Sequence, residues 1–166
     1  MNDQKLTARQ IAVAIVRDRF TRSMILPNVI PADWFECDVL EITKAGYCVE
    51  YEIKVTRGDF FADKNKSRFM SVNGGPRIDT PKLDALGHHD GPARFWYVTP
   101  PGLVTLSELP EKAGLIEFTP RHGERVIKRA LQLHNNKARP ELIRQLRVSA
   151  YFKFCRQFIQ GRAVNE

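Results

Sequence analysis

The sequence predicts a single α/β domain in which helices pack on a central mixed β-sheet. Its 166 residues suit one ordinary domain that can bury its own hydrophobic core. Hydrophobic residues make up 43% of the chain, a fraction typical of folded proteins rather than of disordered ones. Helical and strand periodicities alternate in the order helix, two strands, helix, strand, short strands, helix, which indicates a sheet covered by helices.

The first half of this order rests on clear periodic segments. Residues 6–20 predict a helix, because their hydrophobic positions recur at helical spacing and Thr7 is a suitable N-cap. Residues 21–34 contain two prolines and are expected to form a connection rather than a regular element. Residues 35–42 and 47–55 predict the two strands of a hairpin joined by a short turn.

The middle of the chain is less regular. Residues 56–70 predict a helix with a start that resembles a capping box. Residues 71–93 are rich in Gly, Pro and Asp, which predicts a long mobile connection. Residues 94–101 predict a strand, and 114–118 and 123–130 predict two short strands.

The last predicted helix spans residues 141–160 and is opened by Pro140 at N1, because proline is favoured at the first helical position. Hydrophobic residues recur every four positions along it, so it is expected to have one apolar face, formed by Leu142, Leu146, Ala150, Phe154 and Phe158.

The excess positive charge lies in the last quarter of the chain. Residues 121–166 hold 11 Lys and Arg against 3 Asp and Glu, whereas residues 1–120 hold 15 against 16. This asymmetry suggests a polyanionic partner such as nucleic acid, and an ordinary solvated helix face would explain it equally well. The expected organisation is a main domain over residues 1–130 and a basic helical extension over residues 131–166, packed on the same domain.

The sequence indicates an intracellular protein. It has no run of eighteen apolar residues and no signal-peptide pattern, so we expect a cytoplasmic location, near the nucleoid in a bacterium or in the host cytoplasm for a phage protein. Cys37, Cys48 and Cys155 lack metal-like spacing and are interpreted as small buried residues.

Acidic and basic side chains share one face of the second hairpin strand. Side chains alternate between the faces of a strand, so Glu52 and Lys54 point to the same side. If the turn centres on Ala45, opposed residues have numbers that sum to 90, which places Asp38 across from Glu52 and Glu36 across from Lys54. The apolar sides of the two strands agree in this register, which favours it over a one-residue slip.

This arrangement suits metal-assisted hydrolysis of a phosphodiester. Two adjacent carboxylates repel when both are ionised, and a Mg²⁺ ion between them would remove that repulsion. A lysine beside the metal could orient an attacking water and stabilise charge that builds on phosphorus. The alternative is a solvated outer face of the sheet with a cross-strand salt bridge between Glu36 and Lys54.

The same residues resemble a known signature. Asp38, then Glu52-Ile53-Lys54, then "TRGDFFADKNK" is similar to the PD-(D/E)XK nuclease superfamily, in which an acid precedes D/E-x-K on the next strand and a helix follows. The stretch "EIKVTRGDFFADKNK", with "FWYVTPPGLV" and "LPEKAGLIEF" after it, resembles more particularly the MmcB-like DNA-repair branch. The resemblance covers roughly residues 5–130.

The resemblance implies a restriction-endonuclease-like core and a Mg²⁺- or Mn²⁺-dependent deoxyribonuclease in DNA repair or processing. It implies Asp38 and Glu52 as metal ligands, the backbone carbonyl of Ile53 as a third ligand, and Lys54 as the catalytic lysine. Many members carry a further Glu or Gln on the first helix, where this chain offers Gln10 or Asp18. Asp33 also falls within the loose family spacing, and Asp38 is preferred because it lies on the strand.

Further residues are candidates for binding. Five basic residues could contact substrate phosphates, namely Arg57, Lys64, Lys66, Arg144 and Arg147. His88 and His89 could reach a metal or act as a general base, or form an ordinary loop pair. Two other functions compete with the nuclease: a nuclease-fold protein that binds nucleic acid without cutting it, and a phage or host regulatory module. A homodimer or a protein partner could also form through the C-terminal helix.

Overall fold

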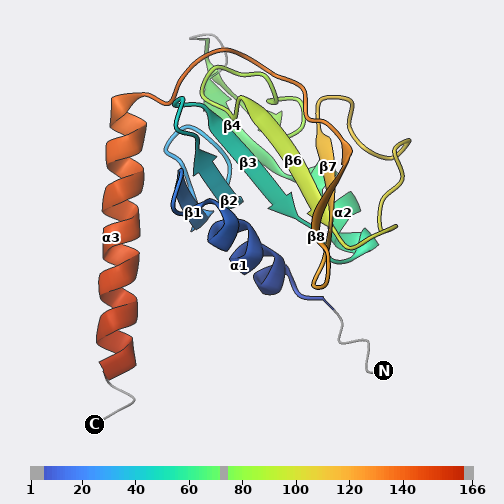
Figure 1. Ribbon diagram of the computed structural model, residues 1–166. Helices are drawn as coiled ribbons and strands as arrows, with labels where there is room; N and C mark the ends of the chain where they lie inside the picture. Colours follow the sequence, from blue (N-terminus) through green and yellow to red (C-terminus); the bar gives the residue numbers. More distant parts are fainter. Residues whose placement is uncertain (1–5, 72–74, 163–166) are drawn as a thin grey trace.

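The protein is built around a six-stranded mixed sheet with the strand order β1-β2-β3-β6-β7-β8 (Figure 1). The structure is a computed structural model that describes residues 6–71 and 75–162. Strands β3, β6 and β7 are parallel, and the other neighbours in the sheet are antiparallel. The elements are, in chain order, α1 (Ala8–Arg19), β1 (Met24–Val29), β2 (Cys37–Ile42), β3 (Cys48–Ile53), α2 (Arg57–Ala62), a short 3-10 helix η1 (Asp63–Asn65), β4 (Ser67–Ser71), β5 (Arg77–Pro81), β6 (Arg94–Thr99), β7 (Gly114–Thr119), β8 (Gly123–Lys128) and α3 (Pro140–Arg162).

The predicted α/β class and central mixed sheet are confirmed, as are most of the individual elements. Helix α1 begins as expected at a Thr7 N-cap, where Thr7 and Gln10 form a reciprocal capping box. Its buried residues Ile11 and Ile15 cover one face of the sheet, whereas Phe60 of α2 belongs to the core on the other face. Both faces of β3 are therefore buried.

The hairpin register is also confirmed. Val39 pairs with Tyr51 and Leu40 with Glu50, so opposed residues sum to 90 as predicted. The turn between the strands places Gly46 at φ +90°, a conformation that glycine adopts without a steric penalty. The Gly46 N–H donates to the Thr43 carbonyl at 2.8 Å, which closes the turn.

The connection predicted over residues 21–34 is wrong, because Met24–Val29 forms strand β1. This strand pairs with β2 along its length, and Pro27 lies opposite Val39. Proline lacks a backbone N–H and is accommodated only where the sheet needs no donor, as on an edge strand. β1 is an edge strand of the six-stranded sheet, so the proline did not break it.

Two expectations for residues 56–93 are also wrong. The helix predicted over 56–70 ends at Ala62, and after η1 the chain turns into β4. The connection predicted over 71–93 contains β5, which pairs with β4 in a separate two-stranded sheet. The sequence carries an Asn-Gly dipeptide between them, which is a strong hairpin signal within the stretch predicted as a connection.

The C-terminal region crosses one end of the sheet and then forms α3 beside the β1 edge (Figure 1). Along the crossing, the Leu133 N–H donates to the Ala93 carbonyl at 2.9 Å and the Ala138 N–H donates to the Gly46 carbonyl at 2.8 Å. On α3, Leu146 is fully buried in the core.

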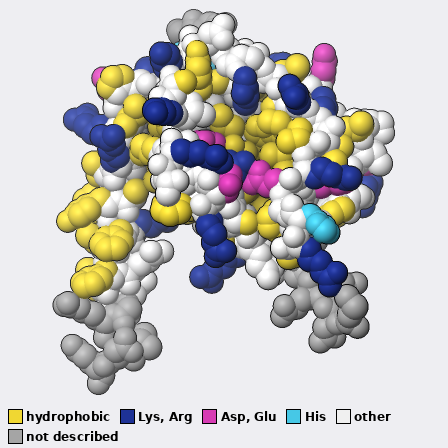
Figure 2. All heavy atoms as spheres, in the orientation of Figure 1, with side chains coloured by type: hydrophobic (Ala, Val, Ile, Leu, Met, Phe, Trp, Pro, Cys, Tyr) yellow, Lys and Arg dark blue, Asp and Glu magenta, His cyan; other side chains and the backbone are white. Residues whose placement is uncertain are grey.

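The single apolar face predicted for α3 is correct only near its start. Phe154 is 64% exposed and Phe158 is 52% exposed, because the second half of the helix runs past the edge of the domain. Figure 2 shows hydrophobic side chains gathered along this part of the helix. The exposed large hydrophobic residues of α3 are Val148, Tyr151, Phe152, Phe154, Phe158 and Ile159.

Candidate functional site

The hairpin brings the three predicted catalytic side chains together at one end of β2 and β3. Asp38 lies near the start of β2, Glu52 lies near the end of β3, and Lys54 follows β3 directly. The Ile53 N–H donates to Asp38 Oδ2 at 2.7 Å, which holds the aspartate against the Glu52-Ile53-Lys54 segment. The confirmed register is the reason that these residues meet.

This face is not the solvated surface that the alternative interpretation required. The Glu52 and Lys54 side chains are 1% and 3% exposed, and Lys54 Nζ lies 2.8 Å from Glu52 Oε1. Lys54 Nζ also lies 2.9 Å from Asp63 Oδ1, and it forms no ion pair with Glu36 among the described residues. Buried charges must be paired to persist, so these contacts make the strand face a closed ionic cluster.

Three lysines surround Glu52. Lys54 and Lys66 reach Oε1 at 2.8 and 2.6 Å, and Lys82 reaches Oε2 at 2.7 Å. The lysines come from the end of β3, the residue after η1 and the residue after β5, so three separate segments converge on one carboxylate.

Two further acids extend the cluster. Asp63 Oδ1 lies 2.8 Å from Lys66 Nζ, and its other oxygen accepts a hydrogen bond from the Tyr97 hydroxyl at 2.8 Å. Glu50 Oε1 lies 2.6 Å from Lys82 Nζ, and Trp34 Nε1 donates to Glu50 Oε2 at 2.7 Å. The enclosed part of the cluster thus contains four carboxylates, of Asp38, Glu50, Glu52 and Asp63, and three ammonium groups, of Lys54, Lys66 and Lys82. The exposed Asp59 carboxylate lies at its rim, 3.7 Å from Lys54 Nζ.

The ionisation of the cluster follows from burial and from these partners. Burial raises the pKa of Glu52, but the ammonium groups of Lys82 and Lys54 outweigh it and hold that pKa well below its ordinary value. Burial lowers the pKa of Lys82, and the Glu50 and Glu52 carboxylates reverse this and raise it. Burial raises the pKa of Asp38, and the nearby Glu52 carboxylate raises it further. Asp38 has no ion pair among the described residues, and it is the acid left without a direct counterion.

The donor set fits a hard divalent cation in type. Asp38 and Glu52 supply carboxylate oxygens, the ligands that Mg²⁺ and Mn²⁺ prefer, and the enclosed part of the cluster has one more carboxylate than ammonium groups. Both oxygens of Glu52 contact ammonium groups, so a cation there would have to replace one of them. Lys66 is the one that could withdraw most easily, because its side chain is 43% exposed.

The residues predicted to bind nucleic acid come from two parts of the chain, the segment from α2 to the residue after η1 and helix α3. Lys66 belongs to the ionic cluster, whereas Arg57 forms an ion pair with Glu108 and donates to the Leu103 carbonyl at 2.9 Å. Lys64 Nζ lies 5.4 Å from the centre of the Phe61 ring. Arg144 and Arg147 are exposed on α3, the helix beside the β1 edge of the sheet (Figure 1).

The residues that the sequence left open lie outside the cluster. Gln10 accepts hydrogen bonds within the capping box of α1, and Asp18 forms an ion pair with Arg22 in the turn that follows this helix. Asp33 is in an exposed loop, 3.2 Å from Arg139. His88 and His89 precede β6, where they pack against each other.

Sequence reasoning missed three members of the cluster. Glu50 shares a strand face with Glu52 two residues later, and that spacing was a usable signal. Asp63 and Lys82 carry no comparable signal, because they reach the site only through the turn after α2 and the β4–β5 hairpin.

Comparisons with known proteins support the fold alone. No protein-family model matches this chain, and neither does any curated protein. A solved structure of a protein of unknown function from Silicibacter pomeroyi is similar to it, with a TM-score of 0.60, 18% sequence identity and 90% of each chain covered. Among the described residues, no helix is both long and apolar enough to cross a membrane.

Proposed function

We propose that this protein is a Mg²⁺- or Mn²⁺-dependent nuclease that hydrolyses phosphodiester bonds of DNA, in repair or processing. The observation that carries the proposal is the hydrogen bond from the Ile53 N–H to Asp38, which sets an acid from one strand against Glu-x-Lys on the next. The restriction-endonuclease-like core and the MmcB-like resemblance belong to the same proposal. The order β2, β3, α2 agrees with them.

In this proposal Asp38, Glu52 and the backbone carbonyl of Ile53 would hold the cation. When bound, it would supply electrostatic stabilisation of the developing phosphate charge and a more acidic water. Lys54 is held by Glu52 and Asp63, so its ammonium group is fixed in place before substrate binds. A fixed donor of this kind orients a water molecule and a phosphate oxygen without reorganisation.

The test is cleavage of labelled single- and double-stranded DNA in Mg²⁺, Mn²⁺ or EDTA. Asp38→Asn and Lys54→Ala should abolish cutting, whereas Asp33→Asn is a matched control, since Asp33 also satisfies the loose motif but lies in an exposed loop. Circular dichroism of each variant separates loss of chemistry from loss of fold. Cutting that survives Asp38→Asn but is lost in Asp33→Asn would overturn the site assignment.

A second candidate function has its own support. Both oxygens of Glu52 are within 2.8 Å of lysine ammonium groups, so the cluster could be a structural element of a protein that binds nucleic acid without cutting it. In that case no metal would elicit cleavage. Binding to DNA of many sequences would persist and would weaken steeply with salt.

A protein partner is favoured by the exposed half of α3. Contiguous exposed hydrophobic side chains are uncommon on monomeric proteins and often mark interaction sites. A homodimer or a regulatory complex through this helix would be concentration-dependent and only weakly sensitive to salt, unlike nucleic-acid binding. Analytical ultracentrifugation over a range of protein and salt concentrations distinguishes these cases.

A further inference from the structure

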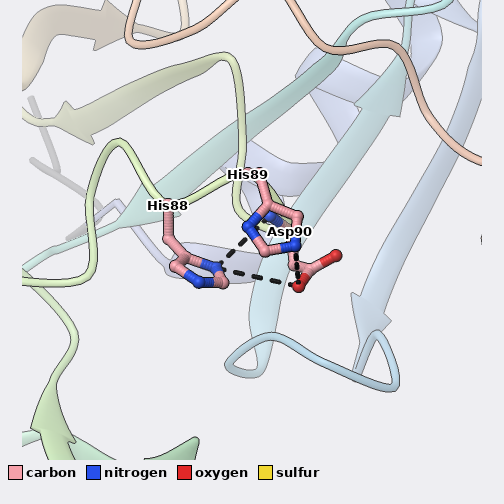
Figure 3. A group of neighbouring side chains, drawn as sticks. All are labelled: His88, His89 and Asp90. Carbon is pink, nitrogen blue, oxygen red and sulfur yellow. Dashed lines mark hydrogen bonds and ion pairs between the residues drawn. The ribbon is translucent and has the colours of Figure 1, made fainter. Parts of the chain in front are cut away.

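A cluster of metal-ligand side chains lies away from the proposed nuclease site, in the loop that leads into β6. His88, His89 and Asp90 each offer one donor atom, and these three atoms all lie within 4.8 Å of one another. Figure 3 shows the two imidazole rings and the carboxylate turned toward one another. Among the described residues, no other group of three or more His, Cys, Asp or Glu side chains brings its ligand atoms within this distance of one another.

The distances are close to those of a bound metal. His89 Nε2 lies 3.0 Å and His88 Nδ1 lies 3.8 Å from Asp90 Oδ2. Ligands at about 2.1 Å from a tetrahedral metal are about 3.4 Å apart, so small side-chain movements would complete the geometry. The Asp90 N–H donates to His88 Nδ1 at 3.4 Å, so this nitrogen carries its lone pair, and a metal bound there would displace this long hydrogen bond.

The surroundings hold this cluster in place and leave it open on one side. His88 is 5% exposed in its side chain and His89 is 52% exposed. Asp90 Oδ1 lies 2.7 Å from an Arg139 guanidinium nitrogen, which orients the carboxylate but also places a positive charge beside it. His89 and Asp90 line a cavity of about 290 Å³, where water molecules could fill the remaining coordination positions.

This cluster and the Glu52 cluster lie toward opposite ends of β3. The Ala93 N–H donates to the carbonyl of Cys48, the first residue of β3, whereas Ile53 ends that strand beside Asp38. Five residue steps at about 3.3 Å per residue separate the two ends by about 16 Å. One ion could not serve both clusters.

We propose that His88, His89 and Asp90 form a binding site for a transition-metal dication of the Zn²⁺ class. The ligands are His88 Nδ1, His89 Nε2 and Asp90 Oδ2. Imidazole ligands suit Zn²⁺, Co²⁺ or Ni²⁺, whereas Mg²⁺ prefers oxygen ligands alone, so Mg²⁺ should not compete. The site is independent of the proposed nuclease activity.

The test is calorimetric titration of the full, chelator-treated chain with ZnCl₂, repeated in excess Mg²⁺. We expect saturable binding of one Zn²⁺ per chain that Mg²⁺ leaves unchanged. His89→Gln should weaken it at least about tenfold, since even outer-shell changes cost 10–100-fold at metal sites. His89 is half exposed, so this variant should fold normally. His122→Gln, at an exposed histidine on the β7–β8 turn, is the matched control and should bind as wild type does.

Two further results complete the test. Asp38→Asn should leave Zn²⁺ binding intact even if it abolishes DNA cleavage, and that result separates this site from the nuclease proposal. Absence of saturable Zn²⁺ binding, or equal binding by wild type and His89→Gln, would overturn the inference and leave the three residues as a hydrogen-bonded turn.

Discussion

Replacement of Lys82 by methionine is the sharpest test of the buried ionic cluster. Lys82 is fully buried and its ammonium group lies 2.6 Å from Glu50 Oε1 and 2.7 Å from Glu52 Oε2. After Lys82→Met, Glu52 keeps Lys54 and Lys66, whereas Glu50 loses its ammonium partner and keeps only uncharged ones such as the Trp34 N–H. One buried carboxylate is then uncompensated.

The expected loss is about 3–5 kcal/mol in the free energy of unfolding at neutral pH, the usual cost of removing one partner of a buried pair. Urea denaturation measures it, and Lys44→Met at an exposed lysine should change stability by no more than about 0.5 kcal/mol. Adding Glu50→Gln to Lys82→Met should recover much of the loss, with a coupling energy of about 2–3 kcal/mol in the double-mutant cycle.

The pH dependence of this variant has a definite sign. Burial raises the pKa of Glu50, and Lys82 opposes that rise, so removing Lys82 must raise the pKa further. A carboxyl group with a raised pKa in the folded state takes up its proton more readily there than in the unfolded chain, which has a value near 4.5. The loss should therefore shrink as pH falls toward 4.5. A loss below about 1 kcal/mol at neutral pH, or a loss that does not change with pH, would refute the arrangement.

Three further outcomes follow from local geometry. Gly114→Ala should destabilise by about 1–3 kcal/mol in urea melts, because its Cβ would lie 2.4 Å from a tryptophan ring, whereas Gly58→Ala meets no atom within 4 Å and should be neutral or stabilising. The Arg57 hydrogen bond lowers the pKa of Glu108 to about 2. The stabilisation from the ionised Glu108 carboxylate should therefore be fully present above pH 4.5 and be lost as pH falls through 2. A carboxyl NMR titration should show a pKa of about 2 in wild type and a pKa closer to 4.5 in Arg57→Gln. A thiol reagent should modify Cys155 alone in the native protein and all three cysteines in denaturant, since the other two are buried.

The sequence by itself determined the parts of this protein that depend on short-range periodicity. The alternation of residues 35–42 and 47–55 predicted the hairpin, its register and the meeting of Asp38 with Glu52, because side-chain direction in a strand repeats every two residues. The Thr7 cap and the start of α3 after residue 139 were likewise local signals.

Tertiary structure decided what local signals could not. Pro27 sits in a strand because that strand lies at the edge of the sheet, and an edge position cannot be read from neighbouring residues. Lys82 lies thirty residues after Glu52, yet the β4–β5 hairpin carries it into contact with that carboxylate. Whether a charged strand face is solvated or enclosed depends on which distant segments cover it. Here the segment after α2 and the chain after β5 enclose it, so charges that an exposed strand would leave in water became a buried cluster.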